Sequence, residues 1–252
     1  MLTNHTVYDK INYGIEPKKY EEDTMRKLII ATYNIRHGAD AELDFSVLAN
    51  DLLSVEADIV GIQEMDIGTK RVAGADSLDL ICKGTPYKYS YFAKAMDYNG
   101  GEYGTAILSR FPIIEAHTQA LESSCYEPRA FGYAKIDVDG EILNFLNTHI
   151  EHMSDEQRRI QFAQLGEFIK GLDSFILTGD FNTDNFSEFD AIEGKKLVNN
   201  SETYFPTFPA HRRAIDNIVI SDKLSYTDAT MVETGHSDHH MLYAVVGGDK
   251  IC

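Results

Sequence analysis

The stretch GHSDHHMLYAVV, residues 235–246, places Ser237, Asp238, His239 and His240 in a row directly before an apolar run. The apolar run predicts the last strand of the fold, because short apolar runs bounded by turn residues are typical of buried strands. The polar residues before it have two interpretations. They form an ordinary polar turn, or they place a carboxylate and an imidazole together at a strand end for chemistry. The choice depends on whether other strands supply partners.

Other apolar runs also carry acid, amide or imidazole groups at one end. These groups are Asn34, Glu64, Asn147, His149, Asp180 and Asn182 at or beyond strand ends, and Asp216, Asp238 and His239 at strand beginnings. In an antiparallel sheet the end of one strand lies beside the start of its neighbour, so all of them can converge on one rim. Each residue alone also fits a structural role, such as a cap for Glu64. Together they predict a site, because burying acids and imidazoles in one place is costly unless a cation or hydrogen bonds compensate.

The residue types in this cluster indicate its chemistry. Carboxylate and amide oxygens without cysteine favour a hard cation, Mg²⁺ or Mn²⁺, over a structural zinc ion. The remaining aspartate and the two histidines then suit proton transfer and charge stabilisation at a phosphorus atom. The sequence contains neither a nucleophile elbow nor a glycine-rich phosphate loop. Acyl transfer and P-loop nucleotide hydrolysis are therefore disfavoured.

The order of the predicted elements indicates an α+β fold. The clearest strands are expected over residues 28–35, 58–64, 174–180, 214–220 and 240–246, and the helices over residues 44–55, 75–84 and 154–172. Asp44 and Ser154 are expected to cap two of these helices. The stretch DVDG, residues 137–140, is expected to form a hairpin turn. Many strands with few helices predict sheets packed on each other with the helices outside.

Length and charge narrow the function further. The chain has 252 residues and a net charge of −17. A change of character at Met25 predicts one catalytic domain over residues 25–252, preceded by a polar N-terminal extension over residues 1–24. Such an acidic chain repels phosphate-rich polymers in general, so nucleic acid is the less favoured partner, whereas cation binding is favoured.

The cysteines and the hydropathy pattern indicate the compartment. Cys82, Cys125 and Cys252 are widely spaced and match neither a disulfide framework nor a zinc pattern. The first residues lack the apolar core of a signal peptide, and no run reaches the ~18 apolar residues of a membrane span. We therefore expect a cytoplasmic monomer with reduced thiols and no stable membrane association.

Seven stretches in a fixed order resemble the endonuclease/exonuclease/phosphatase superfamily, whose fold is that of deoxyribonuclease I. They are ATYNIRHG, DIVGIQE, GGEYGTAILSRFPI, LNTHI, LTGDFN, IDNIVIS and SDHHML, and they span about residues 27–246. The resemblance implies a four-layer α/β/β/α sandwich, in which two mixed, mostly antiparallel sheets pack face to face with helices outside. The chain looks most like the small bacterial metal-dependent hydrolases of this superfamily.

The resemblance implies roles for residues on the metal side of the site. Glu64 matches the principal Mg²⁺ ligand, Asn34 lies at a second metal-side position, and Asp238 matches a carboxylate near the metal. Asp180 matches the residue that positions or deprotonates the attacking water. Asn182 matches the amide that holds this nucleophile.

The resemblance also implies the phosphate side. His239 matches an imidazole that contacts the scissile phosphate, with Asp216 as its orienting partner. His149 matches a second phosphate-binding histidine, and Glu102 is expected to orient it. Arg129 lies where some family members place a phosphate-contacting side chain.

The basic residues outside this cluster leave the substrate open. Lys70 and Arg71 are interpreted either as a solvated loop or as an anion clamp for a phosphorylated headgroup. Arg212 and Arg213 either contact substrate or pair with surface acids.

The expected function is Mg²⁺- or Mn²⁺-dependent hydrolysis of a phosphomonoester or a small phosphodiester, by in-line attack of water without a covalent intermediate. A nuclease is the first alternative, although the chain lacks the basic, aromatic-interleaved stripe that nucleic acid needs. A phospho-ligand-binding protein without catalysis is the second alternative, although every matched catalytic position holds the expected residue type.

Overall fold

The structure is a computed structural model that describes residues 25–124 and 127–248. The expected N-terminal extension over residues 1–24 lies outside the described residues, as do Cys125 and Cys252. Cys82 is a free cysteine. None of the helices in the described ranges is long and apolar enough to cross a membrane.

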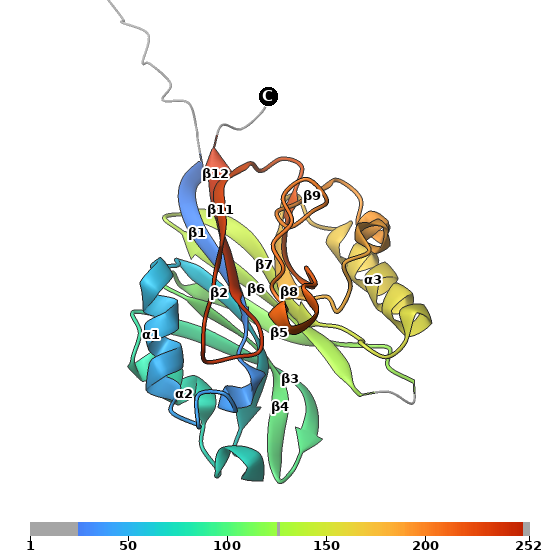
Figure 1. Cartoon of the computed structure of the whole chain (residues 1–252). Helices are drawn as coiled ribbons and strands as arrows, with labels where there is room; N and C mark the ends of the chain where they lie inside the picture. The colour runs from blue at the N-terminus through green and yellow to red at the C-terminus, as the bar shows by residue number, and fades with distance from the viewer. Residues whose placement is uncertain (1–24, 125–126, 249–252) are drawn as a thin grey trace, which may run out of the picture.

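Twelve strands of the described chain form two sheets of six strands each (Figure 1). The strands are β1 (Met25–Asn34), β2 (Ile59–Ile67), β3 (Tyr89–Tyr98), β4 (Gly101–Ser109), β5 (Ile113–Leu121), β6 (Arg129–Val138), β7 (Glu141–His149), β8 (Ile176–Asp180), β9 (Lys195–Leu197), β10 (Asp216–Ser221), β11 (Tyr226–Val232) and β12 (Met241–Gly248). The helices are α1 (Phe45–Val55), α2 (Ser77–Lys83) and α3 (Asp155–Ile169), with short 3-10 turns at η1 (Arg36–Gly38), η2 (Lys70–Val72), η3 (Phe186–Ala191) and η4 (Pro209–His211).

The two sheets have matching topologies. The first has the order β11-β12-β1-β2-β4-β3 and the second β5-β6-β7-β8-β10-β9. Each contains one parallel pair near its centre, β1 with β2 and β7 with β8, and its other neighbours are antiparallel. The predicted fold class, with mixed and mostly antiparallel sheets, is confirmed.

Three hydrophobic clusters separate four layers. Leu48 and Leu52 of α1 and Ile81 of α2 pack on the outer face of the first sheet. Phe162 and Leu165 of α3 pack on the outer face of the second sheet. The third cluster lies between the sheets and is made of aliphatic and phenyl side chains from both. In Figure 1, α1 and α2 accordingly lie on one side of the strands and α3 on the other.

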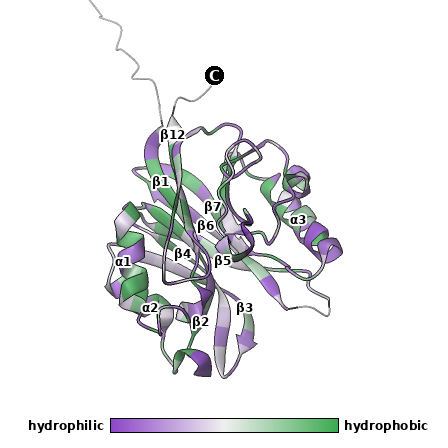
Figure 2. Cartoon of the chain, viewed as in Figure 1, coloured by the Kyte–Doolittle hydropathy of each residue, from purple (hydrophilic) through white to green (hydrophobic). Residues whose placement is uncertain are grey.

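The helices begin where the sequence places an acceptor side chain. The Asp44 carboxylate accepts a hydrogen bond from the Ser46 N–H at 3.0 Å, and the Ser154 hydroxyl accepts one from the Gln157 N–H at 3.2 Å. Each satisfies an N–H that has no partner within its helix. Hydrophobic and hydrophilic residues are mixed along α1 and α3 (Figure 2), as expected for helices with one buried face.

The alternation of side chains along the strands places the polar strand ends in the layer between the sheets. Leu28 and Ile30 of β1 face this layer, so Asn34, an even number of residues further on, falls on the same face. The same count from Leu143 and Phe145 on β7 reaches His149, and Ile218 on β10 leads back to Asp216. Each of these strands is therefore apolar along its inner face and polar at one end.

A buried polar network joins the sheets below this polar end. The Asn147 amide donates to the Ile62 and Ala106 carbonyls at 2.8 and 2.9 Å, and its oxygen accepts from Gln63 Nε2 at 2.6 Å. Gly61 permits this approach, because a Cβ there would lie 2.5 Å from Asn147 Oδ1. Asn147 was predicted to reach the rim with His149, but it is fully buried, and its side chain links the two sheets by hydrogen bonds.

Replacing Asn147 with alanine is therefore expected to lower the free energy of unfolding by ~3 kcal/mol or more, because it leaves several buried polar groups without partners. A urea titration followed by circular dichroism measures the change. The same substitution at the exposed Asn50 of α1 is the control and should alter stability by about 0.5 kcal/mol or less. Equal effects of the two substitutions would contradict the structural role of Asn147.

Candidate active site

The polar strand ends of both sheets meet around one pocket of about 410 Å³. Glu64, Asp238 and His239 reach it from the first sheet and its loops, and His149 and Asp180 reach it from the second. These five residues therefore converge on one pocket, as the sequence predicts.

Two residues of the site have a left-handed backbone that side chains other than glycine rarely adopt. Glu64 has φ = 56° and lies in a β-bulge, where the pairing of β2 with β4 gains one residue between Ile62 and Met65. Asn182 has φ = 53° directly after β8. Such conformations are unfavourable and concentrate at functional sites, and a bulge re-aims a side chain. The bulge turns the Glu64 carboxylate toward the pocket while Met65 returns to the outer cluster.

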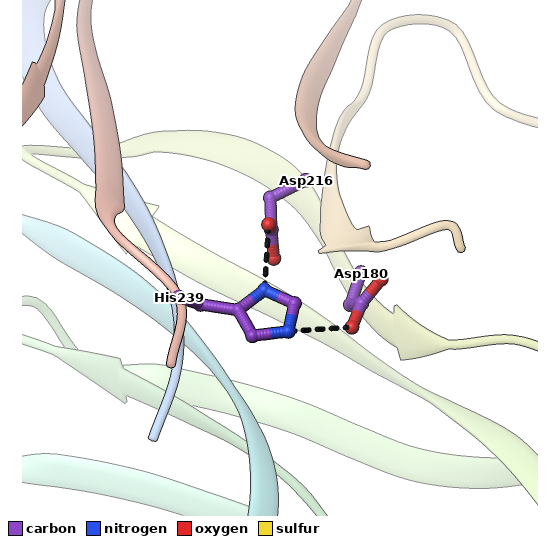
Figure 3. Close-up of side chains that lie close together, drawn as sticks. All are labelled: Asp180, Asp216 and His239. Carbon is purple, nitrogen blue, oxygen red and sulfur yellow. Dashed lines mark hydrogen bonds and ion pairs between the residues drawn. The ribbon is translucent and has the colours of Figure 1, made fainter. Parts of the chain in front are cut away.

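An imidazole lies between two buried aspartates at the centre of the site (Figure 3). His239 Nδ1 lies 2.8 Å from Asp216 Oδ2, and His239 Nε2 lies 3.7 Å from Asp180 Oδ2. Burial opposes the charged form of His239, but the two carboxylates outweigh burial and raise the pKa of His239 to about 10. The imidazole is therefore a cation at neutral pH, held in orientation by Asp216.

Asp180 is a carboxylate of the pocket whose titration is shifted toward neutral pH. Its burial and the negative charge of Asp216 raise the pKa of Asp180 to about 7. The Asn182 N–H donates to Asp180 Oδ1 at 2.9 Å, and Asn34 Nδ2 donates to Asp180 Oδ2 at 3.0 Å. A carboxylate held this way is oriented and also basic enough to accept a proton.

Asn34 orients two carboxylates in the structure, and its predicted role as a metal ligand stays a prediction. Its Oδ1 accepts the Arg36 N–H at 3.0 Å, which fixes the amide so that Nδ2 donates to both Glu64 and Asp180. An amide N–H cannot bind a cation. In this arrangement Asn34 acts on the metal side through the position of Glu64.

The side chains of Glu64 and Asp238 fit a hard divalent cation. Both carboxylates line the pocket and are partly exposed to it. Burial alone would raise the pKa of Glu64, but His37 and Asn34 outweigh it and keep that pKa well below its usual value, so Glu64 is ionised. Oxygen ligands with open positions for water match the preference of Mg²⁺ and Mn²⁺.

Asp180, Asp216 and His239 also lie close enough together to hold a metal ion, with ligand atoms within 4.8 Å of one another. This cluster already carries its own positive charge on His239, and each nitrogen of that ring faces a carboxylate. His37 and Arg36 lie 3.5 Å from the Glu64 and Asp238 carboxylates, but both carboxylates keep part of their surface open to the pocket, so we favour them as the cation site.

His149 is held by a tyrosine. His149 Nε2 lies 3.5 Å from Asp180 Oδ2, and the hydroxyl of Tyr103 lies 3.4 Å from His149 Nδ1. Burial and the charge of Arg129 lower the pKa of His149 well below its usual value, so this imidazole is neutral. When Asp180 is ionised, its oxygen only accepts hydrogen bonds, which places the His149 ring proton on Nε2 and makes Tyr103 the donor to Nδ1.

The predicted partner of His149, Glu102, lies elsewhere. Its carboxylate accepts from Lys94 Nζ at 2.7 Å on the exposed side of β4. Glu102 and Tyr103 are neighbours on one strand, so their side chains point to opposite faces. The sequence reasoning therefore chose the correct segment and the wrong residue.

Replacing Tyr103 with phenylalanine is expected to lower kcat/KM about 2- to 10-fold, because it removes one hydrogen bond to His149. The glutamine variant of Glu102 is the matched control, since it changes the neighbouring residue on the opposite face. Initial-rate kinetics with a phosphoester substrate measure both. A larger loss for the Glu102 variant would restore the sequence-based assignment.

With the geometry in place, comparison with known proteins identifies the family. The family model described as "Endonuclease/Exonuclease/phosphatase family" matches residues 31–239, most of the chain. The chain belongs to the endonuclease/exonuclease/phosphatase family. Members of this family hydrolyse phosphoesters. No curated protein matches the chain in sequence.

Solved structures of the endonuclease/exonuclease/phosphatase family have the same fold at low sequence identity. One from Bacteroides vulgatus is 22% identical with a TM-score of 0.71, covering 88% of this chain and 98% of that one. A mannosyl-6-phosphatase from Bacteroides thetaiotaomicron is 20% identical with a TM-score of 0.67, covering 87% and 99%. D. rerio TDP2 with a single-strand DNA product is 19% identical with a TM-score of 0.70, covering 87% and 98%.

The basic pair of this family member does not form an anion clamp in the structure. Lys70 is exposed and lies outside the pocket. Arg71 lines the pocket, but its guanidinium forms two 2.7 Å hydrogen bonds with Asp66 and lies over the rings of Tyr98 and Tyr103, 4.6 and 5.2 Å from their centroids. Because Asp66 neutralises its charge, Arg71 is better suited to support Tyr103 than to bind an anion.

The loop before β10 contributes residues that sequence reasoning left undecided or missed. Arg213 lines the pocket and donates to Asp184 and to the Asn182 carbonyl, whereas Arg212 is exposed and is not among the pocket residues. Phe208 was missed, and its ring lies 5.0 Å from that of His239. An aromatic residue in a loop carries no sequence signal that would distinguish a role in the site from a role in packing.

Proposed function

We propose that this chain is a divalent-metal-dependent phosphoesterase that hydrolyses a phosphomonoester or a small phosphodiester by direct attack of water. The observation that carries the proposal is the position of Asp180. This carboxylate, with its pKa raised to about 7, lies beside the imidazoles of His149 and His239 and is oriented by Asn34 and Asn182.

Different residues of the pocket act on the attacking water and on the phosphoryl group. Asp180 accepts the proton of the attacking water, because its raised pKa makes the carboxylate a competent base near neutral pH. The cationic His239 ring compensates the charge that develops on the phosphoryl oxygens, and the neutral His149 donates a hydrogen bond from Nε2. Asp216 keeps His239 charged and correctly oriented.

Glu64 and Asp238 would hold the metal ion, which supplies Lewis-acid polarisation of the phosphate when bound. No serine, threonine or cysteine lines the pocket in the part of the chain that the structure describes. A serine or threonine hydroxyl or a cysteine thiol is therefore not at hand as a nucleophile, which supports attack by water without a covalent intermediate.

The choice of a small substrate rests on charge and size. The net charge of −17 repels a polyanion, and a pocket of about 410 Å³ suits a small ligand. Among the similar structures, one is a mannosyl-6-phosphatase and another holds a DNA product. The fold thus accommodates both substrate classes, and the acidity of this chain favours the first.

The test is hydrolysis of p-nitrophenyl phosphate, bis-p-nitrophenyl phosphate, single-stranded DNA and double-stranded DNA, each with Mg²⁺, Mn²⁺ or chelator. We expect metal-dependent release of p-nitrophenol and little cleavage of DNA. Preferential cleavage of DNA would establish a nuclease instead. Binding of phosphate esters without turnover under every condition would favour the non-catalytic alternative.

A further inference from the structure

A group of polar side chains in the pocket takes no part in the proposed chemistry. Glu127, Arg129 and His152 all line the pocket beside His149. Arg129 begins β6, and the register that pairs Phe131 with Thr148 places it next to the end of β7. His152 follows that strand end by three residues.

These three side chains leave hydrogen-bonding capacity unused. Arg129 is only 3% exposed, yet its Nε has no hydrogen-bond partner among the described residues. Its Nη1 lies 3.0 Å from Glu127 Oε1, but neither atom makes a hydrogen bond of acceptable geometry. Buried polar groups are normally satisfied, and such a group at a pocket wall indicates a ligand. The Arg129 Nη2 group does donate to His152 Nδ1, at 3.2 Å, because a guanidinium only donates.

We propose that Glu127, Arg129 and His152 form a subsite for the hydroxyl groups of the substrate's alcohol part, so that the substrate is a phosphorylated polyol such as a sugar phosphate. This inference rests on the proposed function, because it names the substrate class of the same site.

The balance of donors and acceptors selects hydroxyl groups. Arg129 Nε offers a donor, the His152 ring, whose Nδ1 accepts from Arg129, offers its Nε2–H, and the Glu127 carboxylate offers acceptors. A hydroxyl group uses both kinds, since it donates and accepts. The hydroxyl-bearing part of such a ligand is neutral. When it binds here, the Glu127 carboxylate and the Arg129 guanidinium therefore stay paired with each other.

A phosphate group fits this subsite less well. An ionised phosphate oxygen only accepts hydrogen bonds, so it cannot use Glu127, and the carboxylate repels it at short range. The phosphoryl group therefore belongs with His149 and His239 at the metal side, and its alcohol extends toward Arg129. Tyr98 and Met96 line the same pocket and offer apolar surface to the carbon skeleton of such an alcohol.

The deciding experiment compares two phosphomonoesters in the wild type and in Glu127→Gln. One is a hexose 6-phosphate or an inositol monophosphate, and the other is p-nitrophenyl phosphate, whose ring has no hydroxyl groups. We expect the ratio of their kcat/KM values to fall about 10-fold or more in the variant, through a higher KM for the polyol ester, because a charged hydrogen bond is lost. Glu122→Gln, which changes an exposed residue outside the pocket, is the control and should keep the wild-type ratio.

Three outcomes would overturn the subsite. An unchanged ratio in Glu127→Gln would remove Glu127 from substrate recognition. An equal gain in kcat/KM for both esters would place the phosphate on Arg129, because loss of the negative charge would then favour every anionic substrate. Hydrolysis of p-nitrophenyl phosphate by the wild type, without hydrolysis of any polyol ester, would leave the proposed function intact and exclude the substrate class. Hydrolysis of neither monoester, nor of bis-p-nitrophenyl phosphate, would overturn the proposed function itself.

Arg129→Lys provides a second test that does not depend on Glu127. Lysine keeps the positive charge but cannot supply the planar donor set, so the same ratio should fall while circular dichroism and the thermal midpoint report the folding. A folded variant with the wild-type ratio would contradict the proposal.

Discussion

Alanine at Asp180 is expected to lower kcat for phosphoester hydrolysis by roughly 10²- to 10⁴-fold, the usual effect of removing a general base. The physical reason is that Asp180 is the carboxylate in the pocket whose pKa is raised to about 7, and it lies within 3.7 Å of both imidazole Nε2 atoms. Initial rates at saturating substrate and metal measure the effect.

The matched control for this substitution is Asp190→Ala, since Asp190 is an exposed aspartate outside the pocket that pairs with Lys195. It should retain wild-type activity. A folded Asp180 variant with more than about a tenth of the wild-type kcat would contradict the assignment of Asp180 as the base.

The second large effect is expected on metal dependence. Glutamine at Glu64 should raise the Mg²⁺ concentration needed for half-maximal activity by at least 10- to 100-fold, the range observed when groups supporting a metal are altered. Glu64 supplies an ionised carboxylate with an open face toward the pocket. Rates measured across a Mg²⁺ series, after removal of metal with chelator, test this expectation.

Glu56→Gln is a close control, because Glu56 is also a glutamate with a left-handed backbone, φ = 51°, but lies exposed at the end of α1. Any loss caused by strain at such a backbone would affect both variants. A Mg²⁺ dependence of Glu64→Gln equal to that of the wild type would contradict the metal-binding role.

The parts of the site that follow simple strand alternation were predictable. Asn34, His149, Asp180 and Asp216 lie on the inner faces of their strands, at an even spacing from apolar residues that the sequence displays. Periodicity therefore predicted both the strands and the end at which the polar groups meet. The family resemblance supplied the number of layers, which periodicity alone does not contain.

The remaining parts depend on contacts between distant segments. The bulge at Glu64 is a local register shift, which a count of residues along one strand cannot locate. The neutralisation of Arg71 by Asp66 and the place of Phe208 beside His239 arise only after folding. The sequence shows that Arg71 carries a positive charge, but it does not show that Asp66 is the residue that pairs with it.

The site is divided between the two sheets, so the rate of catalysis depends on how the sheets are positioned relative to each other. Glu64 and the Asp238–His239 pair are carried by one sheet, whereas His149, Asp180 and Asp216 are carried by the other. A shear of one sheet against the other by less than one atomic diameter would leave each half intact and separate the base from its partners. The aliphatic residues between the sheets, far from any substrate, consequently hold the alignment on which turnover depends.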